Sequence, residues 1–119
     1  MSKKKKRKRA PVQPTGRNRH HLLFQGRHWN VGMAKELRNY FIYYVPIRTH
    51  NELHNHVLHD VPKPPPDALK PLHTQFLADK WQLDHMDIID ALEWLEMACD
   101  YVPFRDAIRT QRDFFKSHQ

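Results

Sequence analysis

A proline-rich run, PKPPP at residues 62–66, divides this sequence into two unlike halves. Proline fixes its own φ and has no backbone N–H, so such a run favours a stiff, extended connector. Seven of the ten histidines lie between residues 20 and 60, before the connector. Chemistry that depends on histidine is therefore expected in the first half of the chain.

Two strands are predicted in this first half. RHHLLF at residues 19–24 is typical of a short strand, and the aromatic and β-branched run YFIYYVPI at residues 40–47 is the clearest strand in the sequence. Pro46 ends the second strand or marks it as an edge strand. Between the two strands, MAKELRN at residues 33–39 indicates a short helix.

A further helix is predicted between the second strand and the connector. Thr49 is a suitable N-cap with Glu52 three residues later, and Leu53 begins an apolar spacing of four residues. A helix of about ten residues is expected here, ending before Pro62.

The second half is expected to be helical, with helices at about residues 67–80, 84–100 and 103–116. Pro71 and Pro103 suit the first turns of the outer two helices. The middle helix has an apolar face and, opposite it, a row of acids without a base among them. These acids, called here the acidic stripe, are Asp84, Asp87, Asp90, Glu93 and Glu96. Such a stripe is typical of a solvated helix face, and it could also dock a basic protein partner.

The N-terminal segment carries most of the positive charge. Residues 1–19 hold nine Lys and Arg and no acid, whereas the remaining hundred residues hold 11 basic and 13 acidic side chains, a formal charge of −2. A segment of this composition is expected to be disordered and able to neutralise phosphates. A purely solubilising tail and a nuclear-localisation signal have the same composition. The predicted nucleic-acid contacts are Lys3, Lys4, Lys5, Lys6, Arg7, Lys8 and Arg9, with Arg17, Arg19, Arg27 and Arg48.

These segments together predict an α+β fold in which a short two-stranded ββα core at residues 19–61 is followed by the connector at residues 62–66. A helical region at residues 67–119 packs on this core, and a disordered basic tail at residues 1–18 precedes it. The single cysteine, Cys99, excludes an internal disulfide and a thiolate zinc site. With no membrane span and no signal peptide expected, the predicted location is intracellular, either cytoplasmic or nucleoid-associated.

Two histidine motifs carry the predicted chemistry. Side chains alternate along a strand, so His20 and His21 should point to opposite sides of the backbone. His50 and His54 are four residues apart, so on a helix they share one face and can reach a single cation. Three imidazoles would then bind a metal, and one would remain to act as a base.

The order HH on a strand, Asn before a second strand and HxxxH on a helix resembles the HNH nucleases, most closely the DNase domains of nuclease colicins. The resemblance covers about residues 19–60 and implies a ββα-metal core. It implies that His20, His50 and His54 bind a metal, that His21 is the general base and that Asn39 pins the loop between the strands. The implied activity is metal-dependent hydrolysis of phosphodiester bonds, with DNA favoured over RNA, in a protein of phage or mobile-element origin.

Several alternatives stay open at this point. Imidazole ligands favour zinc, nickel or cobalt, while manganese or hydrated magnesium remain candidates. Asn30 and Asn51 are rivals for the asparagine, and His28, His56 and His59 are rival ligands. The histidines could instead be surface residues or bind a structural metal. A different class of function is a non-catalytic nucleic-acid-binding, ribonucleoprotein-binding or inhibitor protein on a retired HNH scaffold.

Overall fold

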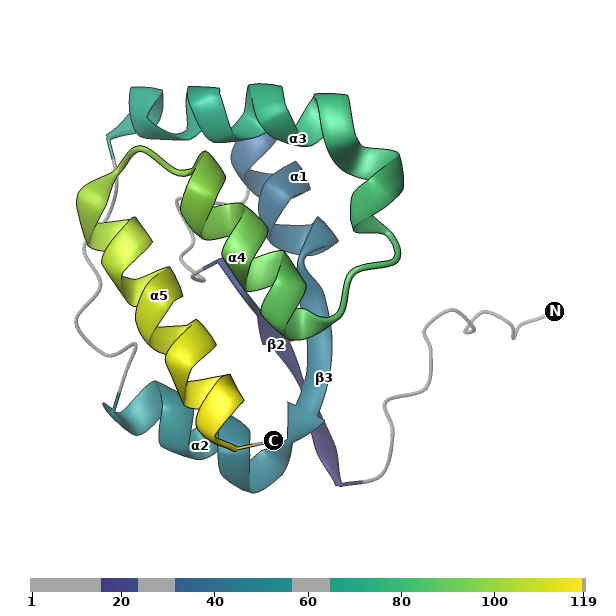
Figure 1. The fold of residues 1–119 in the computed structure, drawn as a ribbon, viewed down its shortest axis with the longest axis vertical. Coiled ribbons are helices and arrows are strands. Elements are labelled where there is room, and N and C mark those ends of the chain that lie inside the picture. The colour runs from purple at the N-terminus through teal and green to yellow at the C-terminus, as the bar shows by residue number, and fades with distance from the viewer. Residues whose placement is uncertain (1–15, 24–31, 57–64, 119) are drawn as a thin grey trace, which may run out of the picture.

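The computed structural model describes residues 16–23, 32–56 and 65–118. Within these residues the fold contains one two-stranded antiparallel sheet and five α-helices (Figure 1). The predicted α+β class is confirmed. The basic residues Lys3 to Arg9 and Arg27 lie outside the described part of the chain.

The sheet pairs β2 (Arg17–His21) with β3 (Ile42–Pro46), and the register sets Arg17 opposite Pro46 and His21 opposite Ile42. Helix α1 (Gly32–Tyr40) precedes β3, and α2 (Ile47–His56) follows it directly. Strand β3 is thus flanked by two histidine-bearing elements: β2 pairs with it in the sheet, and α2 follows it along the chain.

Strand β2 is shifted relative to the predicted strand at residues 19–24. It starts at Arg17, so the last two residues of the predicted disordered tail belong to the sheet, and it ends at His21. Leu22 and Leu23 are both fully buried, whereas a strand with one core face buries only every second side chain. The chain therefore bends after His21 so that both leucines enter the core.

The second predicted strand, residues 40–47, is shortened at both ends. Tyr40 ends α1, and Ile47 begins α2. Thr49 lies inside the first turn of α2, so its prediction as the N-cap is wrong. The N–H of Ile47, at the start of the helix, instead donates to the carbonyl oxygen of Gly16 at 3.1 Å, which satisfies one of the backbone donors that a helix start leaves unpaired.

The helical half contains a 3-10 turn, η2 (Pro66–Leu69), followed by α3 (Lys70–Leu83), α4 (Ile88–Ala98) and α5 (Val102–Ser117). Proline stands in the first turn of α3 and of α5, as predicted. Helix α4 starts four residues later than expected, because the Asp87 side chain accepts the N–H of Asp90 at 2.8 Å and caps the helix there.

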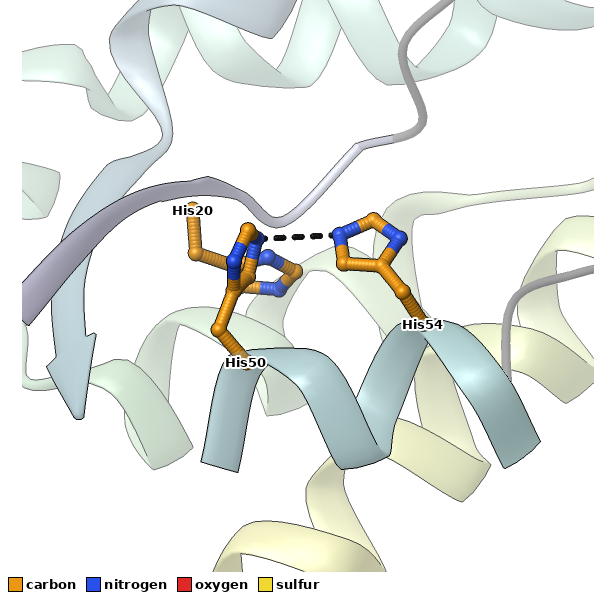
Figure 2. A group of neighbouring side chains, drawn as sticks. All are labelled: His20, His50 and His54. Atoms are coloured by element: carbon orange, nitrogen blue, oxygen red, sulfur yellow. Dashed lines mark hydrogen bonds between the residues drawn. The ribbon is translucent and has the colours of Figure 1, made fainter. Parts of the chain in front are cut away.

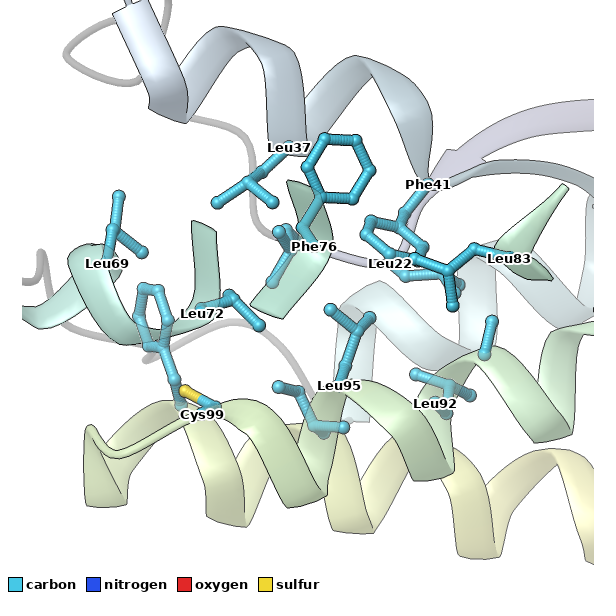
Figure 3. Close-up of a cluster of buried hydrophobic side chains, with 14 of the residues drawn as sticks. Leu22, Leu37, Phe41, Leu69, Leu72, Phe76, Leu83, Leu92, Leu95 and Cys99 are labelled. Carbon is cyan, nitrogen blue, oxygen red and sulfur yellow. The ribbon is translucent and has the colours of Figure 1, made fainter. Parts of the chain in front are cut away.

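One hydrophobic core joins the two halves. Leu37 and Phe41, from the first half, pack with side chains of α3 and α4 (Figure 3). Helix α4 also packs along α5, the most extensive helix pair of the fold (Figure 1). The labelled members of this core are Leu22, Leu37, Phe41, Leu69, Leu72, Phe76, Leu83, Leu92, Leu95 and Cys99. The helical half is thereby held against the histidine-bearing unit.

In the described part of the chain, none of the helices has the length and apolar character that crossing a membrane would demand.

Candidate metal centre

Three histidines from two elements converge at one point. His20 lies on β2, and His50 and His54 lie one turn apart on α2, with their rings directed toward each other (Figure 2). One imidazole nitrogen from each lies within 4.8 Å of the others, and the Nε2 atoms of His50 and His54 are 3.0 Å apart. These three residues are close enough to bind one metal ion, as the two histidine motifs predicted.

The spacing of these nitrogens and the burial of His20 suit a cation. Two imidazole nitrogens bound to one tetrahedral zinc at about 2.0–2.1 Å lie about 3.3 Å apart, which is close to the His50–His54 separation. His20 is fully buried, and among the described residues its Nδ1 has no hydrogen-bond partner. A buried nitrogen without a partner costs free energy unless a ligand satisfies it. The donor set therefore fits a divalent metal.

The three rings are held in the neutral form that metal binding requires. Burial is the main reason that the pKa of His20 is lowered to about 4; the hydrogen bond to Gln111 opposes this effect, and the nearby His50 and His54 add to it. Burial also lowers the pKa values of His50 and His54. Each ring is thus neutral at neutral pH and has one nitrogen lone pair, and a bound cation would replace the hydrogen bond between Nε2 of His50 and Nε2 of His54.

Asn18 contacts this cluster, and sequence reasoning missed it. Its Nδ2 lies 3.2 Å from Nδ1 of His50. Side chains alternate along β2, so Asn18 lies on the same face as His20. This spacing could have indicated from sequence that Asn18 contacts the cluster. Asn39, the predicted asparagine, lies exposed in the last turn of α1, and its role remains a prediction. The rival Asn51 is exposed on α2.

Asn30, His28 and His59 lie outside the described residues, and the side chain of His56 is likewise not described.

His21 follows His20 on β2 and is 8% exposed. Burial, and then the positive charges of Arg38 and Arg19, lower the pKa of His21 to about 4. The nearby His50 has a smaller effect in the same direction on this pKa. His21 is therefore a neutral imidazole whose surroundings are positively charged. Arg38, on α1, was not among the predicted site residues.

The described basic residues of the predicted nucleic-acid surface, Arg17, Arg19 and Arg48, are exposed on β2 and α2. They lie on the same two elements that carry the three metal-site histidines.

Two of the five residues of the acidic stripe, Glu93 and Glu96, pair with bases of the protein, which corrects the view that the stripe lacks a compensating base. Glu93 pairs with Lys116 at 3.4 Å, and Glu96 pairs with Arg109 at 2.8 Å and with Arg112. All three bases belong to α5, which packs along α4 but lies beyond it in the sequence. The stripe as a docking surface remains a prediction.

No protein-family model matches this chain, and neither the curated proteins nor the solved structures contain a match.

Acid should destabilise the metal-free protein at mild pH. The pKa values of His20 and His21 are lowered from 6.5 to about 4 in the folded protein, so the unfolded chain binds more protons between these values. Their contribution to stability is complete above pH 6.5 and is lost as the pH falls toward 4. One pKa unit corresponds to about 1.4 kcal/mol, so the loss should reach several kcal/mol. Urea unfolding in chelator across this range measures it.

The variant His21→Ala should show a weaker dependence of unfolding free energy on pH than the wild type. A wild-type unfolding free energy that stays flat over the same interval would contradict the burial of two neutral imidazoles.

Proposed function

We propose that this protein is a metal-dependent endonuclease of the HNH type that hydrolyses phosphodiester bonds in DNA. The observation that supports this most is the convergence of His20, His50 and His54 from a strand and a following helix. On a scaffold that had lost its nuclease function, these histidines could lie far apart. Here one nitrogen of each ring lies within 4.8 Å of the other two.

In this proposal, His20, His50 and His54 hold a divalent cation through neutral imidazoles. The bound cation would orient the scissile phosphate and neutralise charge that develops on the leaving oxygen. Three protein ligands leave coordination positions open for substrate, as catalytic sites require. Imidazole donors favour zinc, nickel or cobalt over magnesium.

His21 is the proposed general base, which takes the proton of the attacking water. It is neutral near pH 7 and therefore able to accept a proton, but a pKa of about 4 makes it a weak base. Burial is the main cause of this low pKa, and the positive charges of Arg38 and Arg19 add to it; a phosphate bound near these arginines would offset the effect of the charges. Substrate binding would thus raise the basicity of His21 when it is needed.

The activity is tested by incubating supercoiled plasmid with purified protein in zinc, nickel, cobalt, manganese or magnesium. Conversion to nicked or linear forms that chelator abolishes is the expected result. Plasmid that stays supercoiled in every metal, with metal binding shown separately, would contradict the proposal.

The segment KKKKRKR at residues 3–9 is expected to supply affinity for DNA and no chemistry. The chain from residue 20 onward has a formal charge of −2, so most non-specific attraction should come from this segment. Each neutralised phosphate contributes about −0.9 to the slope of log K against log salt, so deleting the segment should flatten that slope by several units. Binding titrations over a salt series measure the slope.

Single-turnover cleavage at saturating DNA should be unchanged by this deletion. Equal salt slopes for the full-length and shortened proteins would show that the segment is not the nucleic-acid contact.

The low exposure of His21, 8%, favours a second candidate function, because a base must reach water. In this alternative the protein binds metal and nucleic acid, or a ribonucleoprotein, without cleaving. It predicts stoichiometric metal and salt-sensitive DNA binding with no nicking in any metal.

A further inference from the structure

A residue of the helical half reaches the metal centre. Gln111 lies on α5, 91 residues from His20 in sequence, and is fully buried. Its Oε1 is 3.0 Å from Nε2 of His20, and its Nε2 donates to the carbonyl oxygen of Leu22 at 2.9 Å. The amide thus bridges the histidine and the bend that follows β2.

These two contacts fix the direction of both hydrogen bonds. The Leu22 carbonyl can only accept, so the Gln111 amide must present its NH₂ group to Leu22 and its oxygen to His20. An amide oxygen can only accept, so Nε2 of His20 must carry the proton and donate it. In a neutral imidazole the other nitrogen then has the lone pair. That nitrogen is Nδ1, the buried atom for which the described residues provide no hydrogen-bond partner.

We propose that Gln111 is a positioning residue that holds His20 in the Nε2–H tautomer, so that Nδ1 is the atom presented to the metal. This inference rests on the metal site of the proposed function. It adds to that site one residue from the helical half of the chain. Groups that hydrogen-bond the free N–H of a metal-binding histidine fix its tautomer and orientation, and their loss typically lowers metal affinity about 10–100-fold.

The two contacts of Gln111 require a side chain that can both accept and donate a hydrogen bond. Leucine in place of Gln111 would leave the Nε2–H of His20 and the carbonyl of Leu22 without this partner in a buried region. Glutamate would still accept from His20 but could not donate to Leu22 when ionised. The two replacements therefore separate the effect on the tautomer from the loss of the bond to Leu22.

The tautomer is measured directly by ¹⁵N–¹H correlation spectra of the histidine rings in chelator-treated protein. Wild-type His20 should show the pattern of an Nε2–H imidazole. Gln111→Glu should keep this pattern. Gln111→Leu should instead show a mixture of the Nε2–H and Nδ1–H tautomers. Ile108→Ala is the matched control, because Ile108 is fully buried one turn earlier on α5 and should weaken packing without altering the tautomer.

Cobalt titration followed by absorption then gives the affinity. Gln111→Leu should bind cobalt about 10–100-fold more weakly than wild type, and Ile108→Ala should bind it as wild type does. Wild-type protein that binds cobalt while its metal-free His20 is in the Nδ1–H tautomer would overturn the role of Gln111 alone. Equal affinities of Gln111→Leu and wild type would do the same. Wild-type protein that binds no cobalt would overturn the proposed metal site itself.

Discussion

Replacing His21 with alanine should slow single-turnover cleavage of plasmid DNA by about 10²–10⁴-fold, which is the usual contribution of a positioned general base. The same variant should keep its metal, because His21 is not one of the three histidines whose ligand atoms converge. This combination separates proton transfer from metal binding. Cleavage rates and metal content, measured on the same preparation, check it.

Two further variants test whether the slower cleavage comes from loss of the base. His21→Gln keeps a polar side chain of similar length and should be as inactive as His21→Ala, since an amide does not accept the proton. His85→Ala removes an exposed histidine in the turn between α3 and α4 and should cleave at the wild-type rate. If His21→Ala cleaves as fast as wild type, the assignment of the base is wrong.

Removing the metal should lower the melting temperature on the order of 10 °C. A metal that binds only the folded state adds about 2.7 kcal/mol at a hundredfold excess over its Kd, and a small domain shifts by about 4–8 °C per kcal/mol. The expected effect is this large because a cation held by His20, His50 and His54 would cross-link β2 and α2 in the folded state only. Calorimetry with and without chelator measures it.

The matched control for this prediction is His54→Ala, which lacks one of the three ligands. Its melting temperature should hardly respond to chelator, because its metal affinity should fall by more than the 10–100-fold that loss of a supporting residue costs. An unchanged wild-type melting curve on chelation, after metal has been shown to be bound, would indicate that the histidines do not share a structural cation.

The three converging histidines could be singled out from sequence, partly from local geometry and partly from the order of the motifs, which resembles that of the HNH nucleases. A spacing of four residues puts His50 and His54 on one helix face, and alternation separates His20 from His21. The α+β class followed from equally local signals, such as the aromatic run that contains β3 and the prolines that open α3 and α5. Signals within one element were sufficient for the elements, whereas the meeting of His20 with His50 and His54 joins two elements.

The remaining features depend on contacts between distant segments. Gln111 meets His20 across 91 residues, and no periodicity links α5 to the histidine motifs. Likewise, Glu93 and Glu96 of α4 are compensated by bases only because α5, which carries Arg109, Arg112 and Lys116, packs along α4. The end of β2 was misplaced because burial of both Leu22 and Leu23 overrides strand alternation. A single sequence carries little information about such packing.

The most direct measurement for the central claim is an anomalous difference map from crystals grown with zinc or cobalt. The account predicts one strong peak enclosed by the imidazoles of His20, His50 and His54. A strong peak at other side chains, with none among these three histidines in metal-saturated crystals, would contradict it.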